Sequence, residues 1–212
     1  MTSLQTFRSI VLTLAIGFLT LMLAARCSDD TAQASTSSSS ANATASLQKA
    51  RVERGRYLVT MIGCGDCHTP LKMTPNGPEP DMSRYLSGHP SNFRISASKQ
   101  PLPQPWVWAG TGTNTAFVGP WGTSYTANLT PDRLTGLGIW TEEMFVKTLR
   151  TGRHWGTARP IAPPMPWQAF RNASDEDLKS IYAYLRSIQP IANEVPQYEP
   201  PAPAAEKKSS RS

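Results

Sequence analysis

Three segments of the chain repeat apolar residues at helical spacing. The clearest covers residues 174–188, and its apolar stripe comprises Leu178, Ile181, Tyr182, Leu185 and Ile188. Ser174 precedes the stripe as a cap, Asp177 follows at the third helical position, and Pro190 stops the pattern. These residues predict a helix over 174–188.

Two further helices are predicted nearer the N-terminus. Thr141 can cap a helix over residues 141–151, whose acidic residues come first and whose basic residues come last, and Gly152 ends it. Its inward face comprises Met144, Phe145, Thr148 and Leu149. Residues 47–62 predict a helix that Ser46 can cap, with an apolar face of Tyr57, Leu58, Met61 and Ile62.

The N-terminal residues have the layout of a targeting segment. Residues 10–25 form an unbroken run of 16 apolar or small residues, which is short for a permanent membrane span. We interpret residues 1–26 as an export signal or a lipoprotein signal. Two processing routes stay open, cleavage near residues 32–34 and lipidation of Cys27, although the arginine before Cys27 departs from the lipoprotein pattern.

Composition divides the rest of the chain. Residues 27–46 are rich in Ser, Ala and Thr and predict a flexible linker, and the Pro-rich residues 193–212 predict a disordered tail. The domain between them, residues 47–192, includes a stretch at 72–126 that is dense in Pro and Gly, which excludes regular helix. We expect this stretch to be ordered, in a packing or docking role, because it carries Trp106, Trp108, Phe117, Trp121 and Tyr125.

Residues 63–68 read GCGDCH, a spacing that suits a zinc site, a redox-active dithiol or covalently attached haem. A structural zinc site usually takes its four ligands from two clusters, and His89 and His154 are isolated in the sequence. A thioredoxin-type dithiol belongs to a βαβ unit, whereas this motif follows a predicted helix. Both alternatives therefore fit the sequence poorly.

Covalent haem fits the motif best. Positions three apart on a helical turn lie side by side, so Cys64 and Cys67 can form thioethers to the two vinyl groups of one haem. His68 is adjacent, and its imidazole can point at the iron; C-x-x-C-H is the signature of c-type haem attachment. The chain contains one such motif, and we predict one haem c.

A low-spin haem needs a second axial ligand, and Met165 is the candidate. It lies in the segment APPMPW at residues 162–167. Because the prolines fix φ and disfavour helix, this segment should be extended and stiff and should hold a thioether in place. The alternative is that Met165 only fills a gap in the core.

The motifs together resemble a bacterial class I-type cytochrome c, in particular monohaem cytochromes related to the cytochrome subunits of periplasmic alcohol and aldehyde dehydrogenases. The similar stretches cover most of residues 50–190 and read YLVTMIGCGDCHTP, TSYTANLTPDRLTGLGIWTEEMF, LRTGRH, PPMPW and DEDLKSIYAYLRSI. The resemblance implies attachment at Cys64 and Cys67, with His68 and Met165 as iron ligands. It also implies an all-α cytochrome c fold, from which the excursion at residues 72–126 departs.

Three packing expectations accompany the resemblance. The first and last helices should cross, with close approach at Gly55 and contacts from Tyr57 or Leu58 to Tyr184 and Leu185. His68 should donate its other ring N–H to a carbonyl, for which the loop at residues 70–78 is a candidate source. Haem propionates have three candidate partners that could equally form a solvated basic face, Arg150, Arg153 and Arg159.

These features predict an exported one-electron carrier rather than an enzyme. Its donor would be a periplasmic dehydrogenase or a quinol-oxidising complex and its acceptor an oxidase, and its net charge of +6 suits acidic docking patches. Without a concentrated basic stripe, nucleic acid is not an expected partner. The alternatives are a haem protein with a labile sixth ligand, acting in catalysis or gas sensing, and a membrane-tethered subunit that docks through residues 72–126.

Overall fold

The structure, a computed structural model, describes residues 40–95 and 102–201. The chain divides into two compact units, Met1–Lys49 and Ala50–Ser212. In the first unit the described residues, 40–49, are helical. The predicted signal at residues 1–26 lies outside the described residues, as does most of the predicted linker. Apart from the start of the N-terminal helix, the remainder of this subsection concerns the second unit.

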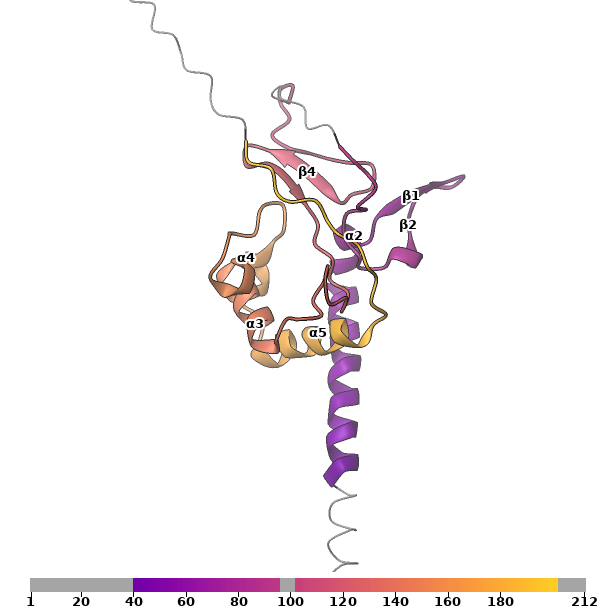
Figure 1. Ribbon diagram of the computed structural model, residues 1–212, viewed down its shortest axis with the longest axis vertical. Helices are drawn as coiled ribbons and strands as arrows, with labels where there is room; N and C mark the ends of the chain where they lie inside the picture. Colours follow the sequence, from indigo (N-terminus) through magenta and orange to yellow (C-terminus); the bar gives the residue numbers. More distant parts are fainter. Residues whose placement is uncertain (1–39, 96–101, 202–212) are drawn as a thin grey trace, which may run out of the picture. The chain divides into compact units, whose positions relative to one another are not determined.

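The three predicted helices are present, and the structure adds two short helices that were not predicted. The N-terminal helix extends through residue 61, and α2 (Cys64–His68), α3 (Glu142–Thr151), α4 (Trp167–Phe170) and α5 (Asp175–Ser187) come after it (Figure 1). Two short 3₁₀ turns, η1 (Met82–Arg84) and η2 (His154–Gly156), lie between them. Within the described residues, no helix is long and apolar enough to cross a membrane.

The predicted caps of α3 and α5 are confirmed. The Thr141 hydroxyl accepts the backbone N–H of Met144, and the Ser174 hydroxyl accepts that of Asp177. Gly152 ends α3 in the left-handed conformation. The predicted cap of the N-terminal helix is wrong, because residues 40–46 are already helical and Ser46 lies inside that helix.

The prediction of an all-α fold is wrong, because the domain contains two antiparallel sheets. In the first sheet β1 (Leu71–Thr74) pairs with β2 (Gly77–Pro80). In the second, the order is β3 (Ala109–Gly110), β4 (Ala116–Gly119) and β5 (Gly122–Tyr125).

The strands arise from the excursion at residues 72–126, for a physical reason. Its Pro and Gly residues exclude helix, but an ordered segment must still pair its backbone N–H and C=O groups. Tight turns allow neighbouring segments to pair, and Thr74 lies opposite Gly77 while Gly119 lies opposite Gly122, so each of these hairpins turns over two residues. Gly77 and Gly122, the first residues after the two turns, have positive φ, which glycine adopts without steric cost.

The aromatic residues of the excursion are only partly packed. Phe117 is buried at 4% exposure, as expected, but Trp106 and Trp108 are 65% and 47% exposed. The excursion is therefore ordered through its strands more than through its tryptophans.

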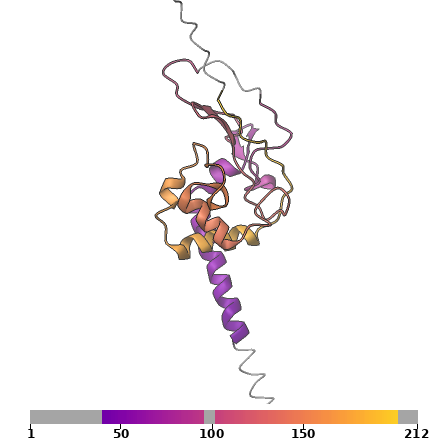
Figure 2. The same cartoon turned by 60° about the vertical axis from the view of Figure 1, so that its left-hand side comes forward.

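The helices share one hydrophobic core, to which the excursion contributes Leu86. Its buried members are Val59, Leu86, Leu137, Phe145, Leu149, Leu178, Ile181 and Leu185. Residues 50–61 of the N-terminal helix cross α5, as Figures 1 and 2 show. A Cβ atom on Gly55 would lie 1.9 Å from the carbonyl oxygen of Ser180, so the predicted close approach is confirmed.

The predicted disordered tail is wrong for residues 193–201, which continue along the domain. Asn193 is 3% exposed. Glu199 pairs with Thr123 of β5 through two backbone hydrogen bonds, of 2.8 Å and 3.0 Å. In Figure 1 this segment runs beside the sheet that contains β4. Pro-rich composition did not prevent order here, because the strand edge and buried polar groups supply partners.

Candidate haem-attachment site

A glycine separates the attachment motif from the N-terminal helix. Gly63 has φ 76°, in the left-handed region, and precedes α2. A Cβ atom there would also lie 2.5 Å from a carboxylate oxygen of Asp66. Glycine therefore allows the chain to change direction, and Cys64 and Cys67 then share a helical turn of their own.

The two thiols are free and partly buried. Burial raises the pKa of Cys64 to about 11 and also raises the pKa of Cys67, with nearby Asp66 acting in the same direction. Redox-active dithiols instead contain a cysteine whose pKa is lowered. The environment of these thiols is therefore unlike that of a thioredoxin-type site.

His68 has a defined tautomer. Its Nδ1 atom lies 2.7 Å from the carbonyl oxygen of Ala127. Because a carbonyl can only accept a hydrogen bond, Nδ1 carries the proton and Nε2 carries the free lone pair. Burial lowers the pKa of His68 and favours this neutral form. The ring thus presents one nitrogen that is ready to bind a metal.

The expectation of a carbonyl partner for His68 is confirmed, but its predicted source in residues 70–78 is wrong. Ala127 lies 59 residues away in sequence. Sequence reasoning missed it because the acceptor is a backbone atom, which any residue carries. The backbone around it is paired on both sides, since Thr126 N–H donates to the Thr115 carbonyl and Leu129 N–H donates to the Leu86 carbonyl, both at 2.9 Å.

Met165 lies in the proline-bracketed segment between η2 and α4. The Ser124 hydroxyl donates to the Pro163 carbonyl at 2.6 Å, which fixes this segment to β5. Met165 is partly buried and packs against the same hydrophobic core as Cys64. The structure thus brings residues from distant parts of the sequence to one core, while the role of Met165 as an iron ligand stays a prediction.

The other histidines are less suited to bind iron. His89 is fully buried, and both of its ring nitrogens are hydrogen-bonded, Nδ1 to the Thr115 hydroxyl at 2.9 Å and Nε2 to the Phe93 carbonyl at 2.8 Å. His154 packs edge-on against Trp140. Within the part of the chain that the structure describes, no group of three or more His, Cys, Asp or Glu residues is placed to hold a metal ion.

The three arginines suggested for propionate binding differ in their contacts. Arg150 forms an ion pair with Asp175 at 2.5 Å and also donates to the Arg171 carbonyl, so its charge is already paired. Arg153 donates to the Ala158 carbonyl at 3.0 Å. Burial lowers the pKa of Arg159.

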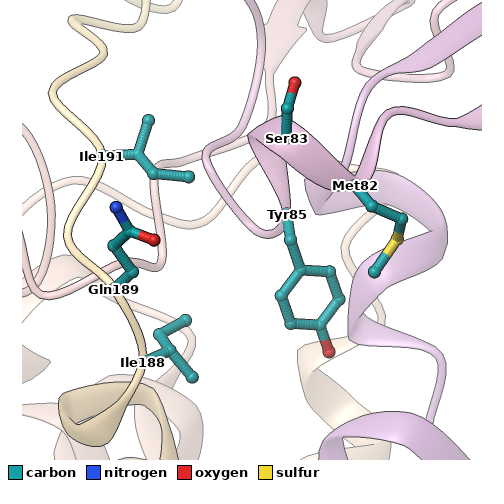
Figure 3. A pocket seen from close by; sticks show the side chains of 6 residues that line it. All are labelled: Met82, Ser83, Tyr85, Ile188, Gln189 and Ile191. Atoms are coloured by element: carbon teal, nitrogen blue, oxygen red, sulfur yellow. The ribbon is translucent and has the colours of Figure 1, made fainter.

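A separate pocket of about 330 Å³ lies between η1 and the segment that follows α5 (Figure 3). None of the predicted haem-binding residues lines it. Its walls are formed by Met82, Ser83, Tyr85, Ile188, Gln189 and Ile191. Tyr85 also packs against the core, and both its burial and a hydrogen bond with Tyr184 raise its pKa.

Comparison with known proteins relates this chain to dehydrogenase subunits. It is 30% identical over 160 residues to the fructose dehydrogenase cytochrome subunit of Gluconobacter japonicus, and 31% identical over 151 residues to a nicotinate dehydrogenase subunit of Pseudomonas putida. It is 29% identical over 145 residues to the cytochrome c subunit of a quinone-dependent alcohol dehydrogenase of Gluconobacter oxydans. No family model matches the sequence.

These matches cover most of this chain but little of the relatives. The match to the fructose dehydrogenase subunit spans 75% of this chain and 26% of that relative. The corresponding shares are 71% and 10% for the nicotinate dehydrogenase subunit, and 68% and 23% for the alcohol dehydrogenase subunit. The chain is thus related to cytochrome c subunits of dehydrogenases, as the sequence motifs predicted.

Proposed function

We propose that this chain is a one-electron carrier that holds one haem c. Cys64 and Cys67 would form its two thioethers, and His68 Nε2 and Met165 would bind its iron. When bound, the haem supplies reversible one-electron chemistry at its iron. The observation that carries the proposal is the hydrogen bond from His68 Nδ1 to Ala127, because it leaves Nε2 as the metal-binding atom on the C-x-x-C-H turn.

The proposed iron ligands determine the reduction potential. Met165 offers a neutral thioether, which favours the reduced iron and gives a higher potential than a second histidine. The hydrogen bond from Ser124 to the Pro163 carbonyl would hold the segment around Met165 in place, so that Met165 and His68 would both stay bound to the iron. The chain then carries electrons and does not transform a substrate itself.

The partners follow from the relatives and from charge. The relatives are subunits of fructose, alcohol and nicotinate dehydrogenases, and we propose a periplasmic dehydrogenase or a quinol-oxidising complex as the electron donor and an oxidase as the acceptor. The net charge of +6 favours short-lived contacts with acidic surfaces. We place the protein outside the cytoplasm, with a membrane tether at Cys27 if that cysteine is lipidated.

The test asks whether haem is covalently attached to the chain. The full chain is produced in a bacterium that exports proteins and attaches haem c, and haem is then measured on the denatured polypeptide by mass spectrometry. We expect one haem on the parent and on Cys27→Ser, and no covalent haem when Cys64 and Cys67 are both replaced by Ser. A parent that releases its haem on denaturation, or binds none, would contradict the proposal.

A further inference from the structure

Asn193 is a buried hub at which the C-terminal segment meets the loop after η1. Its side-chain nitrogen Nδ2 lies 2.7 Å from the Ser87 carbonyl and 2.9 Å from the His89 carbonyl. Its side-chain oxygen accepts the Arg84 guanidinium at 3.0 Å and the Ser91 backbone N–H at 2.9 Å. Both hydrogens of Nδ2 and both acceptor positions of Oδ1 are therefore used.

The orientation of this amide is fixed by the chemistry of its partners. Backbone carbonyls can only accept, so Nδ2 must face Ser87 and His89, and a guanidinium can only donate, so Oδ1 must face Arg84. No other residue type of this size offers two donors and an acceptor in this arrangement. An aspartate at this position has the same shape but, when ionised, no donor.

The two carbonyls that Asn193 holds flank Gly88, which contacts the backbone of the haem ligand. Gly88 N–H donates to the His68 carbonyl at 2.8 Å. The next residue, His89, donates its N–H to the Thr126 carbonyl at 3.0 Å. Asn193 is thus linked on one side to His68 itself and on the other to the peptide unit before Ala127.

The same C-terminal segment also holds the residue that follows Ala127. The Asn128 side chain donates to the Ile191 carbonyl at 2.8 Å and to the Thr135 hydroxyl at 3.1 Å. The Asn193 backbone N–H donates to the same hydroxyl at 3.0 Å. Residues 191–193 therefore fix the backbone on both sides of the Ala127 carbonyl, which accepts the hydrogen bond from His68.

We propose that Asn193 is a positioning residue for the axial histidine. It fixes the loop at Gly88 against the Ala127 carbonyl, and so sets the strength of the hydrogen bond from His68 Nδ1. A strong hydrogen bond at this nitrogen raises the basicity of a ligating histidine, which stabilises oxidised iron. The inference rests on the proposed function, in which His68 binds haem iron.

The test compares Asn193→Ala and Asn193→Asp with Tyr198→Phe in the full haem-loaded chain. Tyr198 belongs to the same C-terminal segment but donates to the Trp121 carbonyl, away from Gly88. Midpoint potentials and electron paramagnetic resonance g-values of the oxidised protein are measured. We expect Asn193→Ala to have a higher potential and shifted g-values, Asn193→Asp to have shifted g-values as well, and Tyr198→Phe to match the parent.

A measurement on the parent covers the case in which the Asn193 variants do not fold. Hydrogen exchange followed by NMR should show slow exchange of the Gly88 N–H and of the Asn193 side-chain amide hydrogens. Fast exchange of either group overturns the inference, as do parent-like potentials and g-values in folded Asn193 variants. A parent without covalent low-spin haem instead overturns the proposed function, and the inference falls with it.

Discussion

A Cβ atom on Gly88 would lie 2.7 Å from the carbonyl oxygen of Ala127, the atom that accepts the hydrogen bond from His68. It would also lie 2.5 Å from the Thr126 carbonyl oxygen. Gly88 has φ 78°, a conformation that disfavours side chains in any case. Glycine is therefore required here both by conformation and by the close approach of two backbones.

Gly88→Ala should separate these two effects when it is compared with Gly77→Ala. Gly77 also has positive φ, 112°, but no atom lies within 4 Å of its Cβ position. We expect Gly77→Ala to lower the free energy of unfolding by about 1–2 kcal/mol, the cost of left-handed backbone alone. Gly88→Ala should cost roughly 1–3 kcal/mol more, because the carbonyls must move.

The readouts are denaturant unfolding and the NMR resonance of the His68 Nδ1 proton. Gly88→Ala should shift this resonance, since the Ala127 carbonyl is displaced, and Gly77→Ala should leave it unchanged. Equal unfolding free energies and unchanged resonances in both variants would show that the approach at Gly88 is not tight.

The crossing of the N-terminal helix with α5 gives a second prediction. At Gly55 a Cβ atom would lie 1.9 Å from the Ser180 carbonyl oxygen and 2.8 Å from Cβ of Tyr184. Gly55→Ala must therefore push the helices apart, and we expect a loss of about 2–4 kcal/mol in the free energy of unfolding.

The control for this prediction is Gly112→Ala. No atom lies within 4 Å of the Cβ position of Gly112, so its unfolding free energy should stay within about 0.5 kcal/mol of the parent. Thermal or denaturant unfolding of both variants measures the difference. A Gly55→Ala protein as stable as the parent would rule out the crossing as described.

The partly buried side chain of His154 predicts a pH dependence of stability. Burial lowers its pKa from 6.5 to about 4, and the positive charge of Arg159 acts in the same direction. Between these values the unfolded chain binds a proton at His154 that the folded chain does not. Stability should therefore fall as the pH is lowered from about 6.5 to about 4, by at most about 3 kcal/mol from this residue.

His154→Gln isolates this contribution, because glutamine does not titrate. Unfolding measured at several pH values should show a shallower slope between pH 4 and 6.5 for the variant than for the parent. His68 and His89, whose pKa values are also lowered by burial, retain their share of the slope in both proteins. Identical slopes would mean that His154 is accessible to protons in the folded state.

The parts of the fold that local signals control could be predicted from the sequence. Caps and apolar stripes placed α3 and α5 correctly, because these signals act within a few residues. The close approach at Gly55 is confirmed as well, but it was expected from the resemblance to class I-type cytochromes c and not from a local signal. The prediction that Met144 faces inward is wrong, as it lies at the edge of the stripe and is 37% exposed.

The strands could not be predicted, because they depend on pairing between segments. Pro and Gly in residues 72–126 excluded helix but gave no register, and a period of two is hard to recognise in strands of two to four residues. The sequence also did not predict that residues 193–201 are ordered, because their order depends on partners from distant segments. Asn193 becomes buried only because the loop at residues 87–91 presents its carbonyls and N–H groups to it.

The candidate site likewise contains residues that the sequence predicted and residues that it could not predict. The cysteines and His68 follow from a contiguous motif whose geometry a single helical turn determines. The acceptor at Ala127 and the hub at Asn193 depend on tertiary structure, so their roles carry no signature in the sequence. Met165 lies between these cases, because its prolines mark it locally while its position against the core depends on the fold.

The central claim is that Met165 fills the sixth coordination position of a haem held at Cys64, Cys67 and His68. The most direct measurement is the optical spectrum of the haem-loaded chain, oxidised and reduced, with and without carbon monoxide. It is made beside Met165→Ala and beside Met73→Ala, in which the methionine replaced is 77% exposed in the parent.

We expect the parent and Met73→Ala to be six-coordinate and low-spin, to show the weak band of a methionine–iron(III) bond and to bind carbon monoxide poorly. Met165→Ala should lose that band and bind carbon monoxide readily. A parent that is high-spin, or that binds carbon monoxide as readily as Met165→Ala, would contradict the account and point to a haem with a labile sixth ligand.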